Sequence, residues 1–305
     1  MTQSGFIAIV GRPNAGKSTL LNAVLDAKVS IVTPKAQTTR ERVLGILTTA
    51  HGQLVFVDTP GIHTAKPGGI NEYMVSEARE ALDQPAVIWY LVDPTSAVEH
   101  EAAVLDILEK APRAPIFLIF NKIDLKGYAY SGAQFEEITV KMAEEMQKRG
   151  IAAAKTFQIS AEREKGLSGL LEESWKLTPE HPHYYPDEEQ ISDRPMRFFV
   201  GEKVREQLFR CLGEELPYSC AVEIERFDES AKPPRIEAVI HVERESQKGM
   251  VIGKGGAKIK EIGTNARKEI EDFLGQTVFL GLRVDVIKDW TKDAKAMKRM
   301  GYVLP

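Results

Sequence analysis

A glycine-rich segment near the N-terminus combines residue types and a spacing that could do chemistry. It reads Gly-Arg-Pro-Asn-Ala-Gly-Lys-Ser-Thr over residues 11–19, after an apolar run at 6–10 and at the start of a helical pattern at 18–25. Glycines permit a tight turn whose backbone N–H groups point toward a phosphate, while Lys17 adds a positive charge and the Ser18 hydroxyl can ligate Mg²⁺. We therefore predict a phosphate-binding loop made of Gly11, Arg12, Pro13, Asn14, Ala15, Gly16, Lys17, Ser18 and Thr19.

Three further motifs follow apolar runs: Asp-Thr-Pro-Gly at 58–61, Asn-Lys-Ile-Asp at 121–124 and Ser-Ala-Glu at 160–162. A carboxylate at the start of the first can hold Mg²⁺ through water, and its glycine lets a backbone N–H approach a γ-phosphate. A carboxylate at Asp124 accepts hydrogen bonds from the N1–H and the exocyclic amine of guanine, a donor pair that adenine lacks. The Lys122 stem would cover the base, and the backbone at Ala161 would donate to guanine O6. We predict a GTP or GDP site formed by Asp58, Thr59, Pro60, Gly61, Asn121, Lys122, Asp124, Ser160, Ala161 and Glu162.

These motifs need a scaffold that brings them together. Strands are expected at 6–10, 54–57, 86–92, 116–120 and 156–159, and helices at 18–25, 70–82, 102–109 and 135–148. This alternation predicts an α/β domain over residues 1–177, built on a doubly wound, mostly parallel sheet. Ligands bind at the carboxyl ends of the strands in such sheets, which is where all four motifs fall.

The helix and strand pattern stops after residue 177. Residues 178–195 carry Pro179, Pro182, Pro186 and a run of acids, so we expect a linker there. Beyond it we expect, in order, a helix at 196–211, strands at 221–226 and 236–243, two helices joined by a Gly-x-x-Gly loop at 253–256, a strand at 278–287 and a short basic tail. The sequence therefore predicts a second, smaller α+β domain at 196–305.

A Gly-x-x-Gly loop lies in the most basic part of this second domain. Residues 244–268 hold seven Lys or Arg against two Glu, which indicates an anionic partner. The loop and the order of elements around it resemble a type II KH fold, whose loop clamps about four nucleotides of single-stranded RNA. Ile252 shares helical spacing with Ile259 and Ile262, which is typical of a core position. We predict RNA contacts from Ile252, Gly253, Lys254, Gly255, Gly256 and Lys258.

The nucleotide motifs resemble those of the TRAFAC-class GTPases. The wording at 11–18, together with Lys-Ala-Gln-Thr-Thr-Arg at 35–40 and the motif at 58–61, is similar to the Era family in particular, and the resemblance covers almost the whole chain. It implies a GTP-hydrolysing switch in which a threonine of the first switch joins Ser18 and Asp58 around Mg²⁺. Thr39 is the favoured ligand, and Thr38 is the alternative.

The same resemblance implies partners and a location. It implies binding to the single-stranded 3′ region of small-subunit ribosomal RNA, a role in maturation of the small ribosomal subunit, and some peripheral association with the membrane surface. We expect a monomer. The two cysteines, Cys211 and Cys220, are too few for a disulfide framework, which is typical of a cytoplasmic protein.

Two positions bear on how GTP is hydrolysed. Ile62 follows Gly61 where Ras-like GTPases have a glutamine, and an isoleucine cannot orient the attacking water. Asn14 resembles the asparagine that places K⁺ beside the phosphates in K⁺-stimulated relatives, although it could instead only cap the turn. We therefore expect slow intrinsic turnover, with catalytic roles for Lys17, Asn14 and Gly61.

Composition supports this picture and leaves two alternatives. The chain has 305 residues, 43% hydrophobic and 28% charged, as in ordinary globular proteins. The longest apolar run, at 86–92, is far shorter than the ~20 residues that cross a bilayer. One alternative is a different TRAFAC GTPase that binds transfer RNA or large-subunit RNA. The other is a non-enzymatic RNA-binding scaffold that uses nucleotide only for stability.

Overall fold

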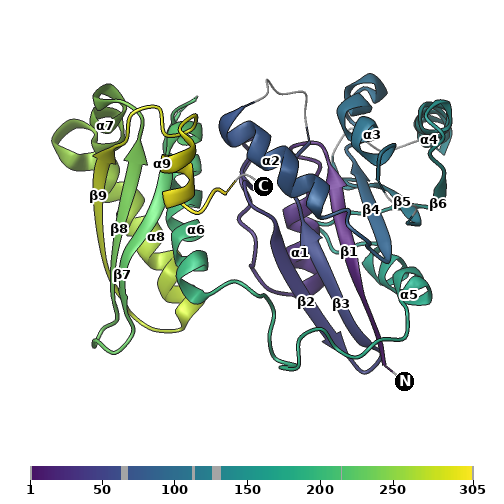
Figure 1. Ribbon diagram of the computed structural model, residues 1–305, viewed down its shortest axis with the longest axis horizontal. Helices are drawn as coiled ribbons and strands as arrows, with labels where there is room; N and C mark the ends of the chain where they lie inside the picture. The colour runs from purple at the N-terminus through teal and green to yellow at the C-terminus, as the bar shows by residue number, and fades with distance from the viewer. Residues whose placement is uncertain (1, 63–67, 112–113, 126–131, 214, 304–305) are drawn as a thin grey trace. The chain divides into compact units, whose positions relative to one another are not determined.

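The chain folds into two compact units. The computed structural model describes residues 2–62, 68–111, 114–125, 132–213 and 215–303 (Figure 1). The first unit contains the N-terminal residues through Ser30, a segment that begins at Thr39, and Met74–Asp193. The second contains Ile31–Thr38, a stretch that ends at Tyr73, and the chain from Arg194 onward.

A six-stranded sheet forms the centre of the first unit, in the order β2-β3-β1-β4-β5-β6. Its strands are β1 (Gln3–Gly11), β2 (Val43–Thr49), β3 (Gly52–Asp58), β4 (Val87–Val92), β5 (Ile116–Phe120) and β6 (Ala153–Gln158). Only β2 runs antiparallel to its neighbour, so the prediction of a mostly parallel sheet is confirmed. β2, which pairs with β3 across a short turn, was not among the strands predicted from the sequence.

Helices cover both faces of this sheet. They are α1 (Lys17–Leu25), α2 (Gly69–Glu80), α3 (Ala102–Leu108), α4 (Gly132–Lys148) and α5 (Leu167–Leu177), with a short 3-10 helix at Val98–Glu101. Adjacent residues of β4 show the two faces, because Trp89 donates to Ser174 of α5 while Tyr90 donates to Glu101 beside α3. The doubly wound arrangement is confirmed, although α5 was not among the expected helices.

The segment expected to be a linker lies against the sheet of the first unit. The amide of Ile46 in β2 donates to the carbonyl of Ile191 (2.9 Å), and the side chain of Gln53 makes hydrogen bonds to both backbone groups of Tyr185 (2.9 and 3.0 Å). Residues 178–193 therefore have defined backbone partners and belong to the first unit.

The second unit has the element order that the sequence predicts. It contains α6 (Met196–Cys211), β7 (Ala221–Asp228), β8 (Arg235–Val242), α7 (Glu245–Ile252), α8 (Ala257–Leu274), β9 (Phe279–Val286) and α9 (Ala294–Arg299). β7 pairs antiparallel with β8, and β8 pairs parallel with β9. The basic tail differs from expectation because it includes the helix α9. In neither unit is any described helix long and apolar enough to cross a membrane.

Candidate functional site

The glycine-rich loop turns between the end of β1 and the start of α1. At Gly16 the backbone has φ 97°, and an added Cβ would lie 2.2 Å from the side-chain nitrogen of Asn121, so only glycine fits there. The amide of Ile62 donates to the carbonyl of Gly11 (3.1 Å), which holds the Asp-Thr-Pro-Gly segment beside the loop. Within that segment, the Thr59 hydroxyl donates to the carbonyl of Ile9 (2.8 Å).

Lys17 folds back over the loop that precedes it. Its Nζ donates to the carbonyls of Gly11 (3.1 Å) and Arg12 (2.8 Å), and the side chain is buried. Burial lowers the pKa of Lys17 to about 8, a shift opposed by the negative charges of Asp58 and Glu101. The ammonium is therefore mostly charged at neutral pH, and its donors are bonded to the carbonyls of the loop itself.

Three oxygen-bearing side chains expected around Mg²⁺ meet at the end of β3. The Ser18 hydroxyl donates to Oδ2 of Asp58 (2.7 Å) and lies 2.9 Å from the hydroxyl of Thr39. The other carboxylate oxygen, Oδ1, is buried and has no hydrogen-bond partner. Burial raises the pKa of Asp58, and the nearby Lys17 charge opposes that shift.

The two threonines of the first switch have different surroundings. The Thr38 hydroxyl is within 2.7 Å of the Thr33 hydroxyl and donates to the carbonyl of Lys35 (2.9 Å). Only the Thr39 hydroxyl contacts Ser18. Of the two threonines, Thr39 is thus the one whose hydroxyl lies beside the side chains expected to bind Mg²⁺.

Asn121 joins the loops expected to surround a nucleotide. Its side chain donates to the carbonyl of Ala15 (2.9 Å) and accepts from the amide of Ala161 (2.9 Å). The amide of Ala161, expected to donate to guanine O6, therefore already has an acceptor. Contact with a base would need a shared or exchanged hydrogen bond.

The remaining base-site residues lie around Asp124. Its carboxylate accepts a hydrogen bond from the Ser160 hydroxyl, which itself accepts from the amide of Arg163 (3.0 Å). Nζ of Lys122 is 2.6 Å from a carboxylate oxygen of Asp93. Burial alone would raise the pKa of Asp93, but hydrogen bonds from Lys122 and Thr95 outweigh it and lower the pKa.

Some neighbours of this site belong to none of the four sequence motifs. Arg12 contacts Ser96 and lies 3.9 Å from the buried carboxylate of Glu101, and Asp93 pairs with Lys122. The spacing of Asp93 after an apolar strand was the one available hint, because polar residues at strand ends line such sites. In contrast, the predicted Glu162 is exposed and Asn14 is exposed with φ 63°.

In the second unit, the Gly-x-x-Gly loop connects α7 to α8. Gly253 has φ 73°, and an added Cβ would approach Cβ of Lys258 to 2.7 Å, so this glycine permits the close turn. Lys254 and Gly255 are exposed at the tip. Lys258 instead pairs with Glu261 (2.7 Å), and Ile252 is partly buried against the core.

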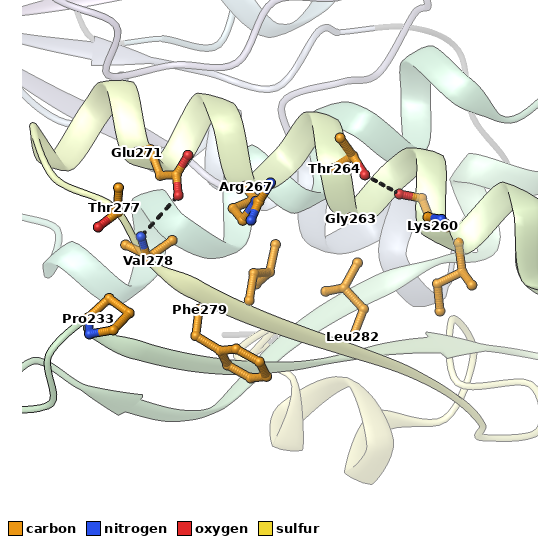
Figure 2. Close-up of a pocket in the computed structure, with 12 residues that line it drawn as sticks. Pro233, Lys260, Gly263, Thr264, Arg267, Glu271, Thr277, Val278, Phe279 and Leu282 are labelled. Atoms are coloured by element: carbon orange, nitrogen blue, oxygen red, sulfur yellow. Dashed lines mark hydrogen bonds between the residues drawn. The ribbon is translucent and has the colours of Figure 1, made fainter.

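A groove that no sequence motif indicated lies between α8 and β9. Its volume is about 730 Å³. Figure 2 shows Arg267 of α8 and Phe279 and Leu282 of β9 at this groove. The guanidinium of Arg235 lies 4.7 Å from the centre of the Phe279 ring. The groove thus offers cationic donors from the helix and an apolar, partly exposed face from the strand.

Comparisons with known proteins agree with this architecture. Residues 6–122 match a family described as 50S ribosome-binding GTPase, and residues 215–291 match the KH domain family. The protein is therefore a P-loop GTPase with a C-terminal KH domain. The GTPase Era of Stenotrophomonas maltophilia (strain K279a) is 44% identical over 299 residues, which cover 98% of this chain and 97% of that protein. The chain belongs to the Era family of GTPases and is an enzyme that hydrolyses GTP.

Two solved structures are similar over nearly the full length. Era in complex with MgGDPNP and nucleotides 1506–1542 of 16S ribosomal RNA has a TM-score of 0.90 and 36% identity, with both chains covered completely. A variant of Aquifex aeolicus Era bound to GDP and AlF4⁻ has a TM-score of 0.90 and 35% identity, covering 99% of this chain and all of that one.

Proposed function

We propose that this GTPase is a nucleotide-controlled switch that binds the 3′ region of small-subunit ribosomal RNA through its KH domain and assists maturation of the small ribosomal subunit. The main support is the likeness to Era bound to a 16S ribosomal RNA fragment, together with the groove between α8 and β9. The groove is lined by Ile259 and Lys260 of the first turn of α8, directly after the Gly-x-x-Gly loop, so one strand of RNA could contact the loop through its backbone and the groove through its bases.

The direct test compares RNA fragments under fixed nucleotide states. We expect a fragment from the 3′ end of small-subunit RNA to bind more tightly than transfer RNA or a large-subunit fragment of equal length, and its affinity to differ between GDP and a non-hydrolysable GTP analogue. Equal affinity for all three RNAs would refute the small-subunit assignment and favour the alternative of a different RNA. Multiple-turnover phosphate release tests the scaffold alternative independently.

We propose that Ser18, Thr39 and Asp58 hold Mg²⁺. The donor set fits, because Mg²⁺ prefers hard oxygen ligands and Asp58 keeps one buried oxygen without a partner. When bound, Mg²⁺ would neutralise charge on the phosphate oxygens. Lys17 would add a second positive charge there, and the amide of Gly61 would donate to the γ-phosphate. The Ile62 side chain is buried and has no polar atom, so the attacking water must be oriented by other groups.

Guanine recognition is proposed for Asp124, with Ser160 fixing its carboxylate and Asn121 fixing the surrounding loops. We assign the Lys122 stem to the face of the base. Ala161 and Glu162, the other predicted contacts, are assigned only backbone contacts in this proposal. The Ala161 amide is bonded to Asn121, and the side chain of Glu162 is exposed.

The K⁺ role of Asn14 and the location of the protein rest on the resemblance. If Asn14 helps to hold K⁺, hydrolysis will be faster in K⁺ than in Na⁺, and Asn14→Ala will remove the difference while GDP binding persists. Equal rates in the two salts would refute this role. Cytoplasmic location and peripheral membrane contact are tested by cell fractionation and by flotation with anionic lipid vesicles.

A further inference from the structure

Asn22 connects helix α1 to Val29 and Ser30, which precede the predicted first switch at 35–40. Its Oδ1 accepts from the amides of Val29 (3.0 Å) and Ser30 (2.9 Å), and its Nδ2 donates to the carbonyl of Ser30 (2.7 Å). Both backbone polar groups of Ser30 are therefore bonded to a single side chain. Since α1 begins at the phosphate-binding loop, Asn22 fixes Ser30 relative to that loop.

Ser30 in turn holds the carboxylate of Asp58. The Ser30 side chain is buried, and its hydroxyl donates to Oδ2 of Asp58 at 3.0 Å. Ser18 donates to the same oxygen, while Oδ1 has no partner. Two donors on one oxygen fix the rotation of the carboxylate and leave the other oxygen available to a cation or to its bound water.

We propose that Asn22 and Ser30 are positioning residues that raise Mg²⁺ affinity by orienting Asp58. The proposal rests on the metal role of Asp58 given above. Groups that hydrogen-bond to metal ligands orient those ligands, and their loss typically weakens metal binding by about 10–100-fold. Ser18 is itself a proposed ligand, so Ser30 is the donor to Asp58 that has no other assigned task. Asn22 acts one step farther away, through the backbone of Ser30.

The test measures release of a fluorescent GDP analogue from the full-length protein across a range of Mg²⁺ concentrations. For Ser30→Ala and for Asn22→Ala we expect the Mg²⁺ concentration that half-maximally slows release to rise about tenfold. In excess EDTA, release should be as fast as from the unmodified protein, because the metal is then absent from both. Ser168→Ala, at an exposed serine of α5, is the matched control and should leave the midpoint unchanged.

Two further variants distinguish the possible failures. If Asn22 acts through Ser30, the double variant will show no larger shift than the stronger single variant. Three results would each overturn the proposal. The first is a double variant whose midpoint shift equals the product of the two single shifts. The others are release of the GDP analogue that is accelerated equally with and without Mg²⁺, and an unchanged midpoint in Ser30→Ala. Asp58→Asn tests the metal site itself. An unchanged Mg²⁺ midpoint in Asp58→Asn would overturn the proposed ligand set. A shifted midpoint in Asp58→Asn with an unchanged midpoint in Ser30→Ala would overturn only the positioning role. Ser30→Ala removes a single hydroxyl, so it keeps the test decisive if Asn22→Ala does not fold.

Discussion

Replacing Asn121 by alanine should weaken guanine nucleotide binding, because this one side chain joins the phosphate-binding loop to the Ser-Ala-Glu loop. The amide makes hydrogen bonds of 2.9 Å to Ala15 and to Ala161, and Asn121 is only 2% exposed. A buried group left without its hydrogen bond costs about 1–3 kcal/mol, so the two lost bonds correspond to about 2–6 kcal/mol. This free energy is divided between the stability of the first unit and its affinity for nucleotide. An even division leaves about 1–3 kcal/mol on nucleotide affinity, and since about 1.4 kcal/mol is a factor of ten, we expect GDP affinity to fall by roughly 5- to 100-fold.

The assay is a titration with a fluorescent GDP analogue, accompanied by thermal unfolding. A loss of 1 kcal/mol lowers the unfolding midpoint of a domain of this size by about 2–4 °C, which reports the part of the effect that falls on stability. Asn265→Ala, at an exposed asparagine of the second unit, is the control and should change neither quantity. A folded Asn121→Ala variant that binds GDP within about twofold of the unmodified protein would refute the reasoning.

Four other substitutions test the predicted base site, the predicted RNA-binding surface and a buried acid. Asp124→Asn should shift preference from guanine toward xanthine, because the amide presents a donor where guanine also has one; competition between the nucleotides measures this, and unchanged GTP affinity would remove Asp124 from the site. Charge reversal at Lys254 or Arg267 should weaken RNA binding and make its salt dependence shallower while GTP hydrolysis without RNA persists, and titrations at several salt concentrations check it. Burial raises the pKa of Glu101 to about 7, so the folded protein binds a proton at this carboxyl more tightly than the unfolded chain does. The free energy of unfolding gained from this proton is complete below about pH 4.5 and is lost as pH rises through 7. Glu101→Gln, which keeps an acceptor for Tyr90, should therefore gain on the unmodified protein by on the order of 3 kcal/mol between pH 4.5 and 7.5 in urea unfolding, and a constant difference would contradict the assignment.

The sequence predicts the central strands well because their signal is strong and local. Five consecutive apolar residues give β5 its observed bounds, Ile116–Phe120. The edge strand β2 gives no comparable signal, since Val43–Thr49 contains a glycine and two exposed or half-exposed threonines. Its pairing with β3 depends on the tertiary structure. The helix α9 was similarly hidden in a segment that charge alone described as a basic tail.

The candidate site divides in the same way. Residues within the motifs could be predicted because the chemistry of phosphate and guanine fixes their types and spacing. Asn22 and Ser30 belong to no such pattern, because their role depends on hydrogen bonds that a folded loop creates between α1, residue 30 and the end of β3. The groove between α8 and β9 was missed for a related reason: no short motif encodes a surface shared by a helix and a strand.

The hydrogen bonds between residues 178–193 and β2 affect where the chain can be cut. β2 is the outer strand of its sheet, and its outward-facing amide at Ile46 and carbonyl at Leu44 are bonded to Ile191 and Ser192. A fragment that stops at residue 177, where the helical pattern ends, would leave these groups free to pair with another molecule, which is how exposed edge strands aggregate. A fragment that continues through Asp193 would retain the residues that bond to the edge of β2. Any attempt to isolate the nucleotide-binding half should therefore retain the proline-rich segment as part of that half.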